Sequence, residues 1–337
     1  MQIGKVPESV LKRSILNKIN TRRDEVLVHP GVGEDCSVVS VGADEVVVLS
    51  TDPITGTVHD IGRLAALITS NDIASAGAET IGILATILLP DGTSEEELRT
   101  MMIQMEEICA TYDMEILGGH TEISKAVNQP VITVTGIGKM KREHLITTGG
   151  MKPGNELVMT KWAGTEGTAI LACDREDLLK TRFSQEFIDD AKSFSQFLSV
   201  IKDAKIAMEV GVSAMHDVTE GGIFGALWEM ASASGCGVQV ELADIPIRQE
   251  TVEISNFFDI NPYMLISSGS MLIATSYANA LVAKLTCAGI PAAVIGRAIE
   301  GKDKVILSGG ERRFLEPPKS DELYTALEKK FDDKIDG

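Results

Sequence analysis

A helix that must bury an acid constrains this chain more than any other feature of its sequence. Residues 60–78 carry apolar side chains at helical spacing, and Asp72 falls among Ile, Ala, Ser and Gly neighbours. Such a carboxylate is not expected on a solvated face, and a buried charge needs a partner. Arg63 and Lys161 are the nearest basic candidates, and few others stand near. The fold must therefore bring either a base or a cation to this helix.

Four more acidic stretches stand beside small residues. Acids that converge without bases raise one another's pKa values, and divalent cations relieve that repulsion. Mg²⁺ usually arrives with substrate phosphates, while paired glycines and helix N-termini offer backbone N–H groups to an anion. The pattern predicts a phosphate ligand bridged by Mg²⁺. The stretches are 31–36, with Gly33 and Asp35; 50–52, with Thr51 and Asp52; 118–122, with Gly118, Gly119, His120, Thr121 and Glu122; and 215–222, with Asp217, Thr219 and Glu220.

Each stretch also has a purely structural interpretation, which the residues alone leave open. Asp35 and Asp52 can be ordinary turn or strand-end residues, and Asp72 can make a local hydrogen bond. Residues 118–119 can form a tight turn after a short strand, and Asp217 can cap the helix that follows it. The order and spacing of the stretches are therefore more specific than any one of them.

Strand and helix patterns alternate along the chain and predict a mixed α/β, or α+β, fold in two domains. The strongest turn signal in mid-chain is 148–154, and the domain boundary is placed there. We expect an N-terminal domain at 1–150, a second domain at 151–318 and a charged tail at 319–337. Strands are expected near 37–41, 46–49, 81–89, 115–117, 130–137, 157–159, 238–241, 271–274 and 292–295, and helices near 60–78, 93–112, 166–173, 194–210, 221–234 and 279–288.

Composition excludes several function classes. The 337 residues carry a net charge of −18, which argues against the basic stripe that a nucleic-acid partner would need. No apolar run approaches the ~18 residues of a membrane span, and the N-terminus has no apolar signal core, so a cytoplasmic protein is expected. The five cysteines are scattered and are interpreted as reduced thiols. P-loop, kinase, zinc-protease and serine-hydrolase motifs are absent from the sequence.

The order of these stretches resembles the PurM-like, or AIR-synthase-related, superfamily over nearly the whole chain, from about residue 4 to residue 318. Its members include aminoimidazole ribonucleotide synthase, thiamine-phosphate kinase, selenophosphate synthetase and the HypE-type hydrogenase-maturation factors. The HypE-type branch is most similar. Its motifs G-I/V-G-E-D-A-A-V, T-D, D-I-G-x-L-A…N-D-x-A and D-P-T-R-G-G resemble residues 31–38, 51–52, 60–78 and 217–222; residues 133–138 and 295–297 also fit.

The resemblance implies a two-domain fold whose N-terminal domains pair into a shared β-barrel, giving a homodimer. It implies ATP bound near that interface without a P-loop, and Mg²⁺ as the accompanying ion. Asp217 and Thr219 would face the substrate across the domain cleft. The metal and phosphate roles would fall to Asp35, Asp52 and Asp72, and nucleotide contacts to Gly33, Thr51, Asn71, Gly118, Gly119, His120 and Thr121.

The chain departs from the HypE-type pattern at three places. His120 stands where an Asp is usual, so the fourth carboxylate is either missing or supplied by Glu122. Glu220 replaces the Arg of D-P-T-R-G-G, and an acid in place of a base should change which substrate binds. The given sequence ends without the cysteine that HypE-type factors convert to a thiocyanate, so that reaction is not expected. Selenophosphate synthesis is not expected either, because no cysteine precedes Cys36.

These observations predict an ATP- and Mg²⁺-dependent enzyme that phosphorylates, or activates by phosphorylation, an oxygen of a small substrate. The alternative is an accessory or maturation protein that binds ATP and a protein partner without chemistry. A nucleotide-binding regulator or storage protein is a third possibility. The sequence does not identify the substrate.

Overall fold

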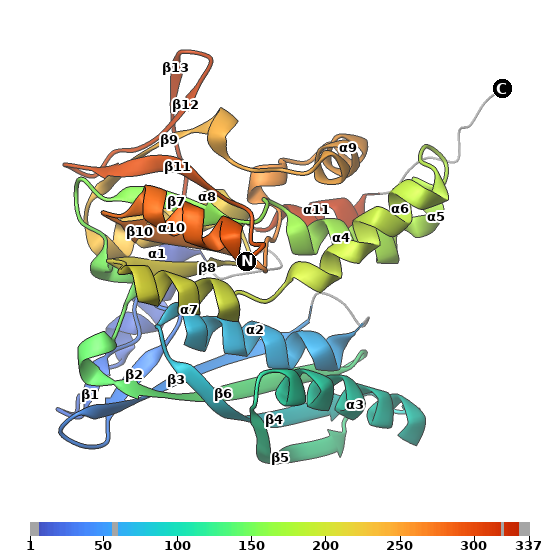
Figure 1. The fold of residues 1–337 in the computed structure, drawn as a ribbon. Helices are drawn as coiled ribbons and strands as arrows, with labels where there is room; N and C mark the ends of the chain where they lie inside the picture. Colours follow the sequence, from blue (N-terminus) through green and yellow to red (C-terminus); the bar gives the residue numbers. More distant parts are fainter. Residues whose placement is uncertain (1–6, 56–59, 318–319, 330–337) are drawn as a thin grey trace.

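The computed structural model describes residues 7–55, 60–317 and 320–329. Its N-terminal half is a six-stranded sheet with the order β1-β2-β3-β6-β4-β5, in which only β4 and β5 run parallel. This sheet is covered on one face by two helices (Figure 1). The strands are β1 (Val26–Val28), β2 (Ser37–Ser40), β3 (Glu45–Ile54), β4 (Glu79–Leu89), β5 (Glu115–Ile123) and β6 (Val131–Lys141), and the helices are α2 (Ile61–Ser75) and α3 (Glu95–Thr111).

Helix α2 is the central element of the molecule. It lies between the N-terminal sheet and α7 (Ile201–Val210) of the second half, and fourteen of its fifteen residues are buried (Figure 1). Two glycines of β6 let it approach the sheet closely: a Cβ at Gly136 would lie 2.7 Å from Thr69 Cγ2, and one at Gly138 would lie 2.4 Å from Ile73 Cγ2. The close packing of α2 on this sheet therefore depends on these two glycines of β6.

The C-terminal half is a seven-stranded sheet with the order β13-β12-β9-β11-β7-β10-β8. Helix α8 covers one face of it, and α7 and α10 cover the other. The strands are β7 (Glu156–Thr160), β8 (Ala214–Val218), β9 (Gly237–Glu241), β10 (Ser270–Thr275), β11 (Ala292–Ile299), β12 (Lys304–Ser308) and β13 (Glu311–Phe314). The remaining helices described are α1 (Glu8–Ser14), α4 (Thr165–Asp174), α5 (Glu176–Leu179), α6 (Gln185–Lys192), α8 (Gly222–Ser234), α9 (Gln249–Phe258), α10 (Ala278–Cys287) and α11 (Glu322–Glu328).

The two sheets comprise residues 26–141 and 156–314, so the turn-rich stretch 148–154 lies in the segment between them. The segment expected as a charged tail packs against the second sheet's helices over its described part. Leu323 and Ala326 of α11 are buried in a cluster with residues of α4 and α9. The apolar residues of this segment are spaced for a surface helix, and the structure shows that the short helix α11 is packed rather than fully exposed.

Three local predictions need correction. The helix predicted for 194–210 is interrupted, because Ser193–Phe197 forms a 3₁₀ turn and α7 begins only at Ile201. Residues 118–119 lie inside β5 rather than in a turn. Asp217 lies in β8 and does not cap α8, whose N-cap is Gly221. None of the helices in the described ranges is long and apolar enough to span a bilayer.

Candidate functional site

A cavity of about 710 Å³ is lined by residues from both halves of the chain. The N-terminal half supplies the loop before β2, the end of β3 and one face of α2; the second half supplies α4, α8, the 219–220 turn and α11. In the part of the chain that the structure describes, no Lys, Arg or His lines this cavity. Seven carboxylates do: Glu34, Asp35, Asp52, Asp72, Glu166, Glu220 and Glu229.

Asp72 is buried at this cavity, as the sequence predicts. Ser50 on β3 donates its hydroxyl to Asp72 Oδ2 at 2.5 Å and lies 3.4 Å from Asp52 Oδ2. Burial, reinforced by the charges of Asp217, Asp52 and Asp35, raises the pKa of Asp72 well above its ordinary value. The expected convergence of acids that raise one another's pKa is therefore confirmed for this group.

Lys161, one of the two bases considered for Asp72, is used elsewhere. Its Nζ lies 2.6 Å from Asp203 Oδ1 and donates to the carbonyls of Ser199 and Gly269 at 2.9 and 2.8 Å. This buried ion pair stabilises the second half of the chain. Lys161 is therefore not the partner of Asp72.

His216 on β8 sits between two carboxylates. Its Nδ1 lies 2.6 Å from Asp35 Oδ2 and its Nε2 lies 3.0 Å from Glu229 Oε2. Burial alone would lower the pKa of His216, but the charges and hydrogen bonds of Asp35 and Glu229 raise it well above the ordinary value. The imidazolium therefore donates from both nitrogens and fixes Asp35 at the cavity wall.

Asp35 also belongs to a group that can hold a metal ion. Ligand atoms of Asp35, His216 and Asp217 lie within 4.8 Å of one another. Because both nitrogens of His216 face carboxylates, the oxygens of Asp35 and Asp217 are the atoms of this group that suit a hard cation such as Mg²⁺.

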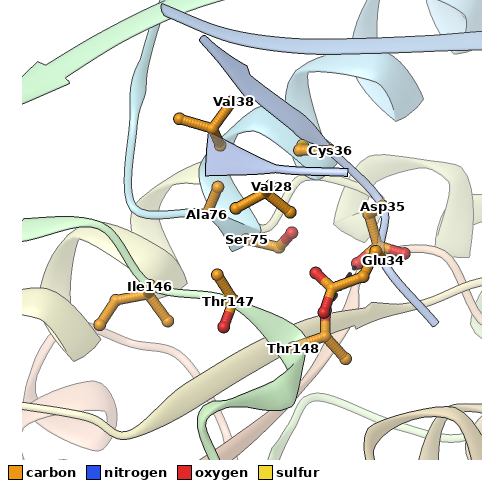
Figure 2. Close-up of a pocket in the computed structure, with 10 residues that line it drawn as sticks. All are labelled: Val28, Glu34, Asp35, Cys36, Val38, Ser75, Ala76, Ile146, Thr147 and Thr148. Atoms are coloured by element: carbon orange, nitrogen blue, oxygen red, sulfur yellow. Dashed lines mark hydrogen bonds between the residues drawn. The ribbon is translucent and has the colours of Figure 1, made fainter. Parts of the chain in front are cut away.

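Asp35 is further held from the loop between the two sheets. Thr148 Oγ1 lies 3.4 Å from Asp35 Oδ2. Figure 2 shows Glu34 and Asp35 beside Thr148, with Val28, Val38 and Ile146 on the apolar side of the small pocket that they share.

The other predicted site residues fall into three groups. Gly33, Thr51 and Thr219 line the cavity. Asn71 does not: its amide nitrogen donates to the Leu198 carbonyl at 2.8 Å, and its oxygen accepts from the Val200 N–H at 2.9 Å. Asn71 therefore joins α2 to the segment that precedes α7.

The third group, residues 118–122, lies on the exposed edge strand β5, outside the residues that line the cavity. Parallel pairing with β4 continues through it, and the register shifts so that Ile83 pairs with Ile116 and Leu84 with Gly118. Gly119 is required there, because a Cβ would lie 1.9 Å from the Ala85 carbonyl oxygen. His120 Nε2 lies 3.3 Å from Glu122 Oε2. One chain alone does not bring this strand to the acidic cluster.

The sequence interpretation missed His216, Glu229, Glu166 and Asp321. Only one of them carries a local signal: Glu166 stands in Gly-Thr-Glu-Gly-Thr-Ala, an acid among small residues like Asp72. Burial, with the charges of Asp321 and Glu220, raises the pKa of Glu166 to about 7, and Ser268 offsets part of that rise. Burial raises the pKa of Asp321 to about 6.

The pKa of Glu166 predicts a pH-dependent stability. The pKa of Glu166 is about 7 in the folded protein and near 4.5 in the unfolded chain. Protonated Glu166 is therefore compatible with folding below pH 4.5, and this contribution to stability is lost as pH rises through 7, where the buried group must ionise. We expect Glu166→Gln to match the wild type at pH 5 and to exceed its unfolding free energy by on the order of 3 kcal/mol at pH 8. Urea denaturation at both pH values measures this. Glu107→Gln, on the exposed face of α3, is the control, and a pH-independent difference would contradict the assignment.

The two-domain architecture is that of a PurM-like protein with mixed α/β content. The chain belongs to the AIR synthase related family: the N-terminal family model matches residues 33–140 and the C-terminal model matches residues 152–308.

Curated relatives agree with this assignment. A hydrogenase expression/formation protein of Methanocaldococcus jannaschii is 26% identical over 80% of this chain and 80% of its own length. The carbamoyl dehydratase HypE of Rhodobacter capsulatus is 29% identical over 71% and 70%. The selenide, water dikinase of Methanococcus maripaludis is 27% identical over 88% and 92%.

Solved structures share the fold. The HypE–HypF complex contains a chain with a TM-score of 0.76 at 20% identity, covering 92% of this chain and 100% of that one. The hydrogenase maturation protein HypE in complex with ATP gives a TM-score of 0.72 at 20% identity, covering 94% and 95%.

Proposed function

We propose that this protein is an ATP- and Mg²⁺-dependent enzyme that transfers the γ-phosphoryl group to an oxygen of a small substrate, as a product or to activate that oxygen for loss. One observation carries the proposal: seven carboxylates and no basic side chain of the described residues line the shared cavity. A nucleotide triphosphate can enter such a site only with divalent cations that offset both sets of negative charge. The ATP complex of a structural neighbour supports the choice of nucleotide.

In this proposal Asp35, Asp52 and Asp72 hold the metal, and Gly33 and Thr51 adjoin the nucleotide phosphates. Asp217 and Thr219 face the acceptor. The acceptor oxygen forms a bond to the γ-phosphorus while the bond from that phosphorus to the bridging oxygen breaks, and ADP leaves. The acceptor's proton passes to a carboxylate, which in this proposal is Asp217, buried in β8 beside Asp35.

Calorimetry with ATP tests the proposal. We expect ATP to bind with Mg²⁺ and to bind at least about 100-fold more weakly in EDTA, because the acids then repel the phosphates. Binding of equal strength with and without Mg²⁺ would refute it. A steady release of ADP, alone or with an added acceptor, separates the enzyme from the second candidate.

That second candidate is an accessory or maturation protein that binds ATP and a protein partner without chemistry. Two observations favour it: a structural neighbour is complexed with another protein, HypF, and this chain departs from the family pattern at His120 and Glu220. It predicts Mg²⁺-ATP binding without ADP formation under any substrate condition.

We also propose that the chain forms a homodimer through the outer face of its N-terminal sheet, which would bring β5 to a partner's site. Supporting this, that face exposes the apolar side chains of Ile81, Leu84, Leu117 and Ile123 on β4 and β5. We expect sedimentation analysis to give a dimer, Leu117→Glu to give a monomer, and Mg²⁺-ATP affinity to fall with it. Val41→Glu, on an exposed hairpin, is the control. A wild-type monomer that binds Mg²⁺-ATP would contradict this proposal.

A further inference from the structure

A second, smaller pocket of about 70 Å³ shares much of its lining with the cavity. Glu166 from α4, Glu220 from the turn before α8 and Tyr324 from α11 line both. Asp321 lines only the smaller one. Among the described residues no basic side chain lines either space, so this end of the cavity is also strongly negative.

The acidic side chains of this pocket differ in their hydrogen-bond partners. Asp321 is occupied by the backbone: its oxygens accept from the N–H groups of Gly221, Ile266 and Leu323 at 2.6, 3.2 and 2.8 Å. The Tyr324 hydroxyl donates to Glu220 Oε1 at 2.9 Å and orients it.

Glu166 is the exception. Its side chain is buried, with the residue only 6% exposed. Burial raises the pKa of the carboxyl group and hydrogen bonding from Ser268 lowers it in part, but Oε2 itself has no hydrogen-bond partner in the described structure. Arg63 lines a neighbouring apolar pocket with Glu166, but no ion pair joins the two in the described part of the chain. A buried carboxylate oxygen without a donor is costly, and a ligand that donates to it would recover that cost.

The geometry favours an organic cation over a metal ion. In the described chain, the only group of three metal-competent side chains with ligand atoms within 4.8 Å is Asp35, His216 and Asp217. Oxygens of Glu166, Glu220 and Asp321 do not form such a group. An ammonium or guanidinium group, with several N–H donors on one charge, suits acids that are spread over a pocket.

We propose that the pocket of Glu166, Glu220 and Tyr324 binds a positively charged nitrogen of the substrate, an ammonium or guanidinium group. This rests on the proposed function, because the same substrate presents its acceptor oxygen to Asp217. The charge at position 220 is opposite to that of the arginine in the motif it otherwise resembles, and the pocket selects against anions accordingly.

A matched series of probes tests the charge preference. With a non-hydrolysable ATP analogue and Mg²⁺ bound, calorimetry compares 4-aminobutan-1-ol, butane-1,4-diol and 4-hydroxybutanoate, with their three- and five-carbon homologues. These share the acceptor hydroxyl and the length of the carbon chain, and they differ in the group at the far end, which is an ammonium, a hydroxyl or a carboxylate. We expect at least one amino alcohol to bind tenfold or more tightly than its diol, and the hydroxy acids to bind most weakly.

Variants locate the effect. Glu220→Arg should weaken the amino alcohol at least tenfold and reverse the preference toward the hydroxy acid, and Glu166→Gln should weaken the amino alcohol without reversing it. Glu107→Gln should change neither. Three outcomes would overturn the inference. They are a preference for the amino alcohol that persists in Glu220→Arg, equal binding of the three kinds of probe, and no binding by any probe. Loss of binding by the ATP analogue itself would instead refute the proposed function.

Discussion

Replacing Asp72 by Asn should make the ligand-free protein more stable and at the same time remove its affinity for Mg²⁺-ATP. The carboxylate is buried, and three other acids raise its pKa, so its charged form costs folding energy at neutral pH. An amide of the same shape keeps the hydrogen bond from Ser50. It cannot offer the metal a negative oxygen. We expect a higher melting temperature in EDTA at pH 8 and an affinity for Mg²⁺-ATP that is lower by about 100-fold or more.

A variant that simply failed to fold would lose both stability and affinity. The expected gain in stability together with a loss of affinity distinguishes the proposed role from unfolding. Thermal unfolding in EDTA gives the first effect, and calorimetry with Mg²⁺-ATP gives the second. Asp44→Asn, in an exposed hairpin turn, is the control and should change neither. If Asp72→Asn is destabilised in EDTA, or binds Mg²⁺-ATP normally, Asp72 is not the buried metal ligand.

Replacing His216 by Leu should cost the largest amount of stability of any single change considered. The variant leaves Asp35 and Glu229 partly buried without the cation that both hydrogen-bond. Removing one partner of a buried charge pair typically costs about 3–5 kcal/mol. Urea denaturation in EDTA at pH 7 measures the loss.

His144→Leu is the matched control, because His144 is largely exposed and its loss should change stability by less than about 0.5 kcal/mol. A loss below about 1 kcal/mol for His216→Leu would show that the imidazole is neutral and not the counter-ion of Asp35. Excess Mg²⁺ should recover part of the loss, since it supplies another positive charge beside Asp35.

The sequence predicts the acidic site well where local pattern and burial coincide. Asp72 stands on a helix whose other residues nearby, apart from Asn71, are small or apolar, so its burial follows from the local pattern. The position of Asp217 does not follow in that way. The stretch Asp-Val-Thr-Glu-Gly-Gly has the residues of a helix N-cap, but antiparallel pairing of β8 with β10, with Asp217 opposite Met271, draws it into a strand.

The same limit applies to residues 118–119. A glycine pair predicts a turn from local preference, whereas here the pair lies in a strand parallel to β4, where a Cβ at Gly119 would collide with the Ala85 carbonyl oxygen. The contribution of α11 was hidden for another reason: Asp321 and Tyr324 are far from the other site residues in sequence, and only tertiary packing brings them to the pocket. Pairings set by long-range contacts are what single-sequence patterns omit.

Asn71 and Asp72 are consecutive residues of α2. Asn71 hydrogen-bonds to the backbone of Leu198 and Val200 in the second half of the chain, whereas Asp72 lines the cavity. The same helix therefore forms the contact between the two halves and part of the cavity wall. Any motion that separates the two halves must break the hydrogen bonds of Asn71 and the contact between Asp35 and His216 at the cavity wall. Occupancy of the site and closure of the contact between the two halves then share a single equilibrium, and the amide proton of Val200 should exchange more slowly with solvent when Mg²⁺-ATP is bound.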